Sequence, residues 1–149
     1  MIRRAEPEDR AAIESIVRAA YAVYIPRIGK PPGPMLDDYA ALIADGTVSV
    51  IEEAGGEIAA LIVLLAKPDH LLLDNIAVRP DRQGHGFGRA LIAHAEHKAK
   101  RLGFNEIRLY THQTMIENIA LYTRLGFAET GRAEQQGYNR VFMTKALTF

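Results

Sequence analysis

Hydrophobic and polar positions alternate along the first half of the chain in a way that predicts short strands and amphipathic helices. Apolar residues from Ile13 to Tyr24 recur at helical spacing, and Pro7 suits the first turn before them. Residues 25–34 hold four prolines and two glycines and are therefore predicted to form a loop. The other expected elements are an edge strand at 1–5, a helix at 35–44, strands at 47–53 and 57–65, and an apolar strand at 71–78.

The second half of the chain continues this alternation. A helix is expected to begin near Phe87, with Gly103 as its C-terminal cap and one apolar face made of Leu91, Ala95, Ala99 and Leu102. The remaining expected elements are a strand at 105–110, a linker at 111–114, a helix at 115–125, and a closing hairpin of 127–132 and 138–146. No repeat or low-complexity segment interrupts the pattern, so we expect one α/β domain over residues 1–149.

The segment from Leu71 to Glu96 combines an apolar strand, a glycine-rich turn and a helix. Pro80 removes a backbone donor and ends the strand. Gly84, Gly86 and Gly88 then bring bare backbone to a helix N-terminus, where the first amide groups lack partners inside the helix and the dipole is positive. Such a turn is suited to hold an anion, most often a phosphate.

Two common phosphate-binding motifs do not fit this turn. A P-loop needs Lys followed by Ser or Thr after its last glycine, whereas Arg89-Ala90 follows Gly88. The dinucleotide fingerprint G-x-G-x-x-G needs a glycine at position 89, which is Arg89. Its acidic ribose partner belongs at the end of the next strand, whereas Glu106 opens that strand.

The pattern Q/R-x-x-G-x-G/A does fit, as Gln83-Gly84-His85-Gly86-Phe87-Gly88. This resembles the pyrophosphate-binding motif of the GNAT superfamily, the acyl-CoA-dependent N-acetyltransferases. A second match lies about forty residues downstream in Ile119–Phe127, where Tyr122, Gly126 and Phe127 are similar to the end of the family's helix motif. The resemblance implies a mixed, mostly antiparallel central sheet flanked by helices, in the order β-α-α-β-β-β-α-β-α-β-β.

The resemblance also implies where acetyl-CoA binds. The pantetheine arm would lie along the backbone of Ile76, Ala77 and Val78, with an amide near Ile76 facing the acetyl carbonyl. The pyrophosphate would lie on the turn, contacted by Gln83, Gly84, His85, Gly86, Phe87, Gly88 and Arg89, with His85 acting through its backbone. Family members often carry an asparagine seven residues before the tyrosine. Here that position is Met115, and Asn118 either replaces it or the contact is absent.

The resemblance further suggests candidates for the chemistry. Tyr122 matches the tyrosine near the CoA sulfur, and a phenol with a pKa of about 10 is protonated at neutral pH and can donate to a thiolate. No general base is clear, and water-mediated proton removal through Asp74 is one hypothesis. Asn75 and His70 lie on or just before the same strand, and Tyr110 ends the next strand, where some family members place a glutamate. Acceptor contacts are expected from the segments that vary within the family, at Tyr21, Tyr24, Arg27, Met35, Tyr138 and Arg140.

The composition limits which partners, metals and cellular locations are expected. The chain has 18 Lys and Arg and 18 Asp and Glu, and zero net charge argues against nucleic acid or a membrane surface as the main partner. It has no cysteine, and no further ligating side chain joins His94 and His97 on their helix face, so no metal is expected. Neither an export signal nor an apolar run of membrane-spanning length is present, so a cytoplasmic location is expected.

Two functions follow from these residues. The first is an acyltransferase enzyme that moves an acetyl group from acetyl-CoA to a primary amine, of a small molecule or a protein, by direct attack in a ternary complex. The second is a non-catalytic acyl-CoA-binding or regulatory module on the same scaffold. An intact Tyr122 and an unbroken central strand favour the enzyme, with the acceptor unidentified and a homodimer left open.

Overall fold

The computed structural model describes residues 1–148, and its centre is a seven-stranded sheet in the order β1-β2-β3-β4-β5-β7-β6. All neighbouring strands are antiparallel except β4 and β5, which confirms the mixed, mostly antiparallel sheet predicted above. The strands are β1 (Ile2–Arg4), β2 (Val48–Glu52), β3 (Ile58–Ala66), β4 (Leu71–Val78), β5 (Glu106–His112), β6 (Ala128–Gln135) and β7 (Tyr138–Ala146).

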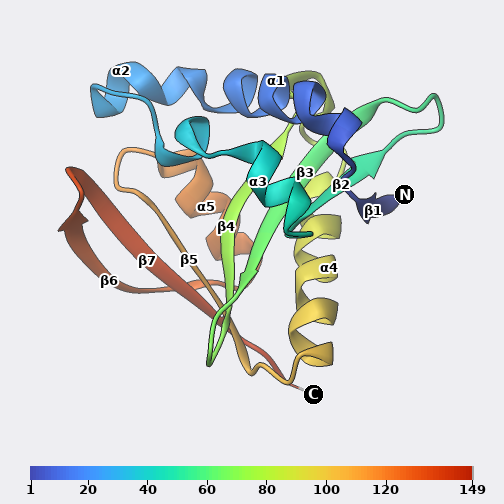
Figure 1. Cartoon of the computed structure of the whole chain (residues 1–149). Helices are drawn as coiled ribbons and strands as arrows, with labels where there is room; N and C mark the ends of the chain where they lie inside the picture. The colour runs from blue at the N-terminus through green and yellow to red at the C-terminus, as the bar shows by residue number, and fades with distance from the viewer. Residues whose placement is uncertain (149) are drawn as a thin grey trace.

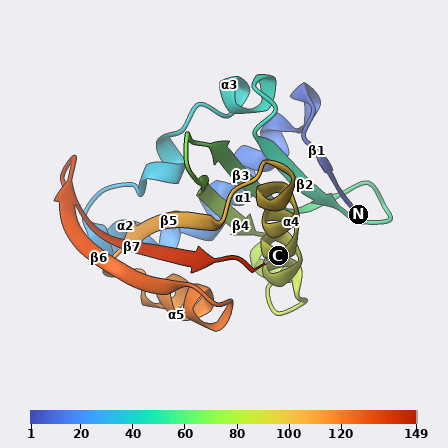
Figure 2. The same cartoon turned by 90° about the horizontal axis from the view of Figure 1, so that it is seen from below.

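Helices cover both faces of the sheet (Figures 1 and 2). They are α1 (Arg10–Tyr21), α2 (Ile25–Ile28), α3 (Tyr39–Ala44), α4 (Phe87–Arg101) and α5 (Ile116–Arg124). One buried cluster joins α1 and α3 to the sheet through residues such as Ile13 and Leu61, and the other joins α4 and α5 through Leu91 and Ile62. Strand β3 is buried from Ile58 to Leu64 because it lies between the two layers.

Strand β4 departs from regular geometry in two places. Its register with β3 steps from Val63↔Asn75 to Leu64↔Leu73, so Asp74 is the extra residue of a β-bulge. Its parallel pairing with β5 stops after Leu72↔Arg108, although both strands continue. Figure 1 shows the two strands together at the lower end of the sheet and apart at the upper end. The sheet is therefore open between the second halves of β4 and β5.

Most expected elements are present, and the differences are local. The 25–34 segment is not all loop, because Pro26 sits in the first turn of α2, where its missing N–H costs nothing. The helix expected at 35–44 begins only at Tyr39, after a 3-10 turn at Gly33–Leu36. The linker expected at 111–114 starts inside β5, and β6 extends past residue 132 to Gln135. Leu102 lies beyond the end of α4 and is 48% exposed, so it does not share the buried face.

Two further expectations about turns are confirmed. Gly103 follows α4 with φ +79°, as expected of a glycine that ends a helix. Strands β6 and β7 form an antiparallel hairpin whose two turn residues, Gln136 and Gly137, both have positive φ, as in a type I′ turn. No helix among residues 1–148 is long and apolar enough to cross a membrane.

Candidate active site

The open edge of β4 exposes backbone donors. The amide of Arg79 donates to the carbonyl of Ala59 at 2.9 Å, so the backbone groups of Arg79 point toward β3. In an antiparallel pair this direction alternates along the strand. The N–H groups of Asn75 and Ala77 therefore also point toward β3, whereas those of Ile76 and Val78 point toward β5. Pairing with β5 has ended there, so these amides face the opening between the strands.

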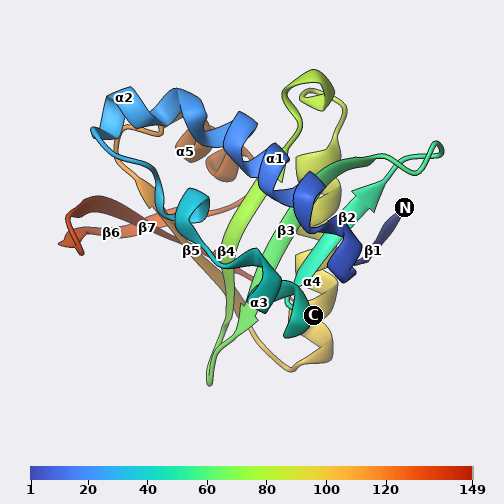
Figure 3. The same ribbon diagram turned by 45° about the horizontal axis from the view of Figure 1, so that its top comes forward.

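A groove of about 460 Å³ runs from this opening to the N-terminus of α4. We call it the glycine-loop groove. The first intrahelical bond of α4 runs from the amide of Ala90 to the carbonyl of Gly86 at 3.0 Å, so the amides of the first turn are free. The loop between β4 and α4 projects above the helix in Figure 3. The groove is lined by residues 76–78, 82–84 and 86–89 from β4, the loop and α4, and by Ala20, Tyr21, Tyr24, Glu117, Asn118, Leu121, Arg124 and Leu125.

The glycines of this loop are required by its conformation. Gly84 and Gly86 both have φ +82°, a region that other residues enter at a cost. A Cβ at Gly84, Gly86 or Gly88 would meet nothing within 4 Å in the chain itself, so the space beside the loop is empty of protein. The backbone is therefore bare on the side where a ligand would approach the helix N-terminus.

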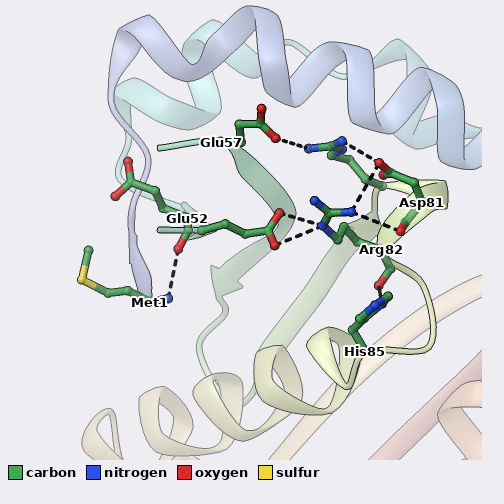
Figure 4. A network of polar contacts seen from close by, with 8 residues as sticks. Met1, Glu52, Glu57, Asp81, Arg82 and His85 are labelled. Atoms are coloured by element: carbon green, nitrogen blue, oxygen red, sulfur yellow. Dashed lines mark hydrogen bonds and ion pairs between the residues drawn. The ribbon is translucent and has the colours of Figure 1, made fainter. Parts of the chain in front are cut away.

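Ion pairs attach the loop to the β2–β3 hairpin (Figure 4). Nε of Arg82 lies 2.8 and 3.0 Å from the two carboxylate oxygens of Glu53, and Arg79 contacts Glu57 at 3.2 Å and Asp81 at 2.7 Å. Nδ1 of the His85 ring lies 3.0 Å from the carbonyl of Arg82, so the ring folds back on its own loop. Among the described residues, Arg89 and Arg124 line the groove without an ion-pair partner, and the sequence analysis did not single out Arg124.

A second cavity of about 290 Å³ lies beside the groove, between β4 and β5. We call it the β4–β5 cavity. It shares Tyr21 and Asn118 with the groove, so the two spaces adjoin. Its walls are Leu73, Asp74 and Asn75 of β4, residues 109–112 of β5, Met115, Tyr122, Gln136, Tyr138 and Arg140, and from the N-terminal half Ile28, Pro32, Gly33, Pro34, Leu36 and Asp37.

A buried hydrogen-bond network holds β4 against the helices of the first half. The Tyr21 hydroxyl lies 2.7 Å from Oδ1 of Asn75 and 2.9 Å from the carbonyl oxygen of Ile76, and these two acceptors share its one proton. Nδ2 of Asn75 donates to the Tyr39 hydroxyl at 2.8 Å. This network satisfies the outward carbonyl of Ile76 and leaves its N–H free on the open edge. Burial and the neighbouring tyrosine hydroxyls, Tyr122 among them, raise the pKa of Tyr21 well above its ordinary value.

Two carboxyl groups meet in the β4–β5 cavity. Asp74 on the bulge of β4 is hydrogen-bonded with Asp37, which lies in extended backbone between the 3-10 turn and α3. Burial, followed by the charge of Asp74 and that hydrogen bond, raises the pKa of Asp37 to about 7. Asp37 is therefore about half protonated at pH 7 and can both donate and accept a proton in that range.

Asp37 is a site residue that was not predicted from the sequence. Of the two adjacent aspartates, only Asp38 caps α3, since its Oδ1 accepts from the amide of Ala41 at 3.2 Å. A second aspartate before a helix start, which the cap does not use, was the one local signal available for Asp37.

Tyr122 reaches the same cavity from α5. Its residue is only 4% exposed and its ring packs edge-on against Phe127 at 5.7 Å. Its hydroxyl has no hydrogen bond to any of residues 1–148, yet none of their buried side-chain oxygen or nitrogen atoms lacks a partner, so the hydroxyl opens into the cavity. Burial raises its pKa, so it is protonated at neutral pH.

The structure distributes the residues singled out above over these two spaces. Ten predicted acetyl-CoA contacts line the glycine-loop groove: Ile76, Ala77, Val78, Gln83, Gly84, Gly86, Phe87, Gly88, Arg89 and Asn118. His85 does not line it. The β4–β5 cavity receives Tyr122, Asp74, Tyr21, Tyr138 and Arg140.

Three predicted acceptor contacts lie elsewhere. Tyr24 lines the groove rather than the cavity. Arg27 lines neither space; it pairs with Glu117 at 2.7 Å and lies over the Tyr24 ring, because the α2 turn aims it at α5. Met35 packs half-buried against the core beneath α1. Nothing in the sequence indicates where the Arg27 side chain lies, since residues 25–34 are predicted to be irregular, and Met35 is predicted in a helix that begins only at Tyr39.

Comparison with curated proteins gives relatives that are acetyltransferases by name. The chain is 35% identical over 98 residues to an uncharacterized N-acetyltransferase of Bacillus subtilis, YvbK, covering 58% of this chain and 63% of the relative. It is 38% identical over 74 residues to the ribosomal protein bS18 alanine N-acetyltransferase of Escherichia coli, covering 50% of each. The chain thus spans between about half and 63% of the length of these two relatives.

Solved structures share the fold over nearly the whole chain. The same alanine N-acetyltransferase of Escherichia coli superposes with a TM-score of 0.75 at 25% identity, covering 100% of this chain and 94% of that one. A PaiA N-acetyltransferase from Thermoplasma acidophilum, solved in complex with coenzyme A, has a TM-score of 0.76 at 19% identity and covers 99% and 98% of the two chains. The sequence profile described as the acetyltransferase (GNAT) family matches residues 10–127. Since that match covers most of the sequence, the chain belongs to the GNAT family of acetyltransferases.

Proposed function

We propose that this protein is an N-acetyltransferase that moves an acetyl group from acetyl-CoA to a primary amine by direct attack in a ternary complex. The observation that carries the proposal is the junction of two spaces at the open edge of β4. One space offers bare backbone at a helix N-terminus, and the other offers a carboxyl pair and a tyrosine hydroxyl. The chain has no cysteine to form a thioester intermediate, which favours direct transfer.

On the donor side, backbone groups do most of the binding. The free amides of the first turn of α4 and the loop around Gly84 and Gly86 suit a pyrophosphate, and Arg89 adds a positive charge. The amides of Ile76 and Val78, unpaired on the β5 side, can take a pantetheine arm as an added strand. The Ile76 N–H then lies where negative charge develops on the acetyl oxygen, which stabilises the transition state.

On the acceptor side, the carboxyl pair binds the amine and receives its proton. An ammonium group can bind beside the carboxylates of Asp74 and Asp37, and it first loses one proton to solvent, because only the neutral amine can attack. When the neutral amine nitrogen forms its bond to the acetyl carbon, it loses a second proton to the pair, directly or through one water, and the pair then releases this proton to solvent. Asp37, with a pKa of about 7, is matched to that task at neutral pH.

On the leaving side, Tyr122 supplies a proton. As the carbon–sulfur bond breaks, the sulfur takes the electron pair and accepts the hydroxyl proton of Tyr122, which has no competing acceptor among the described residues. The phenolate is then reprotonated from solvent. Three residues thus divide the chemistry: Asp74 and Asp37 remove a proton from the amine, and Tyr122 adds one to the thiolate.

The second candidate is a non-catalytic acyl-CoA-binding module. It would need the glycine-loop groove alone and gives no role to the carboxyl pair or to the hydroxyl of Tyr122. The presence of both in one cavity next to the groove favours the enzyme.

Thiol release from acetyl-CoA distinguishes the two candidates. We would measure it across a panel of small amines and short peptides with a free N-terminus, the latter included because one relative is named for a protein alanine. Calorimetry with acetyl-CoA alone measures donor binding. Thiol release that depends on the amine supports the transferase. Binding of acetyl-CoA without thiol release in the presence of any amine would support the module. The absence of both binding and release would refute both candidates.

A further inference from the structure

The β4–β5 cavity contains charges of both signs. Asp37 and Asp74 are its two carboxyl groups, and burial together with the charge of Asp74 raises the pKa of Asp37 to about 7. Arg140 on β7 is the cation of the cavity. His112 also lines the cavity, and it is neutral at pH 7 because burial and the charge of Lys30 lower its pKa. The cavity therefore offers one negative and one positive position.

The guanidinium of Arg140 forms no ion pair with any of residues 1–148. It lies 4.1 Å from the ring centroid of Tyr110, and its nitrogens lie 3.3 and 3.4 Å from the side-chain oxygens of Gln135 and Gln136. The hydroxyl of Tyr110 is a further hydrogen-bond partner. Among residues 1–148 no carboxylate lies within 4.0 Å of it, although two carboxyl groups line the same cavity. A guanidinium has five N–H donors, so donors remain for a ligand.

Tyr110 is close enough to sense both kinds of charge. Burial, followed by the charge of Asp74, raises its pKa, and the guanidinium of Arg140, which lies over its ring, lowers it. The carboxyl groups and the guanidinium thus line one cavity without forming an ion pair among residues 1–148. The Tyr122 hydroxyl, buried and without a partner among the described residues, opens into the same space and marks the end where transfer occurs.

We propose that the acceptor is a small amino carboxylate, whose amine binds at Asp37 and Asp74 and whose carboxylate binds Arg140. This rests on the proposed function and names the substrate class of that site. A guanidinium takes a carboxylate through two parallel N–H···O bonds, which fixes the orientation of the molecule as well as its charge. A diamine would place its second ammonium group against Arg140 and is disfavoured by like-charge repulsion.

The walls of the cavity favour a small molecule over a long chain. The Tyr138 hydroxyl donates to the carbonyl of Pro31 at 2.7 Å, and the Lys30 ammonium lies 4.1 Å from the Tyr138 ring centroid. These contacts attach the proline-rich segment to the hairpin tip, and residues of both line the cavity. At about 290 Å³, the space is near the low end for small-molecule sites.

The test compares acceptors that differ only in charge. We would measure kcat/KM for ω-amino carboxylates from glycine to 6-aminohexanoate, for the amide of each, and for diamines of matching length. Hydrogen bonds to charged groups predict that the best carboxylate exceeds its own amide by at least about tenfold. Acetylation of amides or diamines as efficient as that of the carboxylates would overturn the inference alone. Transfer to no acceptor at all would overturn the proposed function as well.

Variants on the terminal hairpin then locate the preference. Arg140→Gln should reduce the carboxylate-to-amide ratio toward one, and Arg140→Lys, which keeps the charge but not the paired donors, should retain part of it. Arg132→Gln is the matched control, since Arg132 lies on the same hairpin but pairs with Glu129 at 2.6 Å and does not line the cavity. Because the ratio compares acceptors on one protein, a loss of folded protein does not change it. A ratio that survives Arg140→Gln would refute the assignment of the carboxylate to this residue.

Discussion

Replacement of Gly86 by Asp tests whether the loop before α4 holds the pyrophosphate of acetyl-CoA. Gly86 precedes the first residue of α4, with φ +82°, and a Cβ there meets nothing within 4 Å. The added carboxylate would therefore occupy the space proposed for the phosphates without displacing protein atoms. We expect a large loss of acetyl-CoA affinity with little change in fold.

The size of both effects follows from the geometry. Two unit charges about 4 Å apart repel by about 4 kcal/mol at an effective dielectric constant of about 20, and by about half that where water screens them more strongly. This corresponds to a loss of about 30- to 1000-fold in Kd. For stability, the positive φ costs Asp about 1 kcal/mol, and a negative charge at a helix N-terminus returns about 0.3–1 kcal/mol. The Tm should therefore move by no more than about 4 °C.

Two controls separate charge from shape and from backbone strain. Gly86→Asn has nearly the shape of Asp without the charge and should weaken binding by less than about tenfold. Gly103→Asp adds the same side chain at φ +79° with open surroundings, but at the other end of the 15-residue helix, about 22 Å away. It should leave acetyl-CoA affinity unchanged. Calorimetry measures Kd and circular dichroism the Tm; equal affinity in Gly86→Asp and the parent protein would refute the assignment of the loop, and equal losses in Asp and Asn would refute the role of charge.

Three further predictions concern the cavity and the network beside it. Tyr122→Phe should lower kcat by about 10²–10⁴-fold with little change in KM for acetyl-CoA; unchanged steady-state turnover across pH would remove the hydroxyl from the mechanism. In the parent protein kcat/KM should rise with pH as Asp37 loses its proton near pH 7, and Asp37→Asn should abolish that rise; a surviving limb near pH 7 would assign it to another group. Asn75→Ala removes bonds to Tyr21 and Tyr39 and should lower the free energy of unfolding by about 2–3 kcal/mol in urea titrations; a change below about 1 kcal/mol would contradict the importance of this network.

The fold could be predicted because its signals are local. Helix α4 has an apolar face of Leu91, Ala95 and Ala99, glycines before it and a glycine after it, and all of these features were readable within one segment. The hairpin of β6 and β7 likewise depends on a two-residue turn at Gln136 and Gly137. Where signals competed, prediction was wrong: prolines indicated a loop at residues 25–34, but Pro26 is compatible with the first turn of α2.

The candidate site was only partly predictable, for a physical reason. The glycine loop and Tyr122 belong to contiguous motifs. Asp37, in contrast, has a raised pKa partly because of Asp74, which is distant in sequence. Their proximity depends on the bulge that turns Asp74 out of the regular register and on the break in pairing after Leu72. Neither feature leaves a signal in the alternation of apolar residues, since Leu71–Val78 reads as one unbroken strand.

Donor binding is proposed to depend mostly on backbone groups and acceptor binding on side chains, so mutations should affect the two separately. The proposed donor contacts are mostly amides of β4, the loop and α4, and any sequence that keeps the glycines and the open edge supplies them. The proposed acceptor contacts are side chains from three segments that meet only in the folded chain: Asp37, Asp74 and Arg140. Changes at Gly86 should therefore alter acetyl-CoA affinity and leave the ranking of acceptors intact. Changes at Arg140 should reorder the acceptors and leave acetyl-CoA affinity intact, because Tyr21 and Asn118 are the only residues of 1–148 that line both spaces.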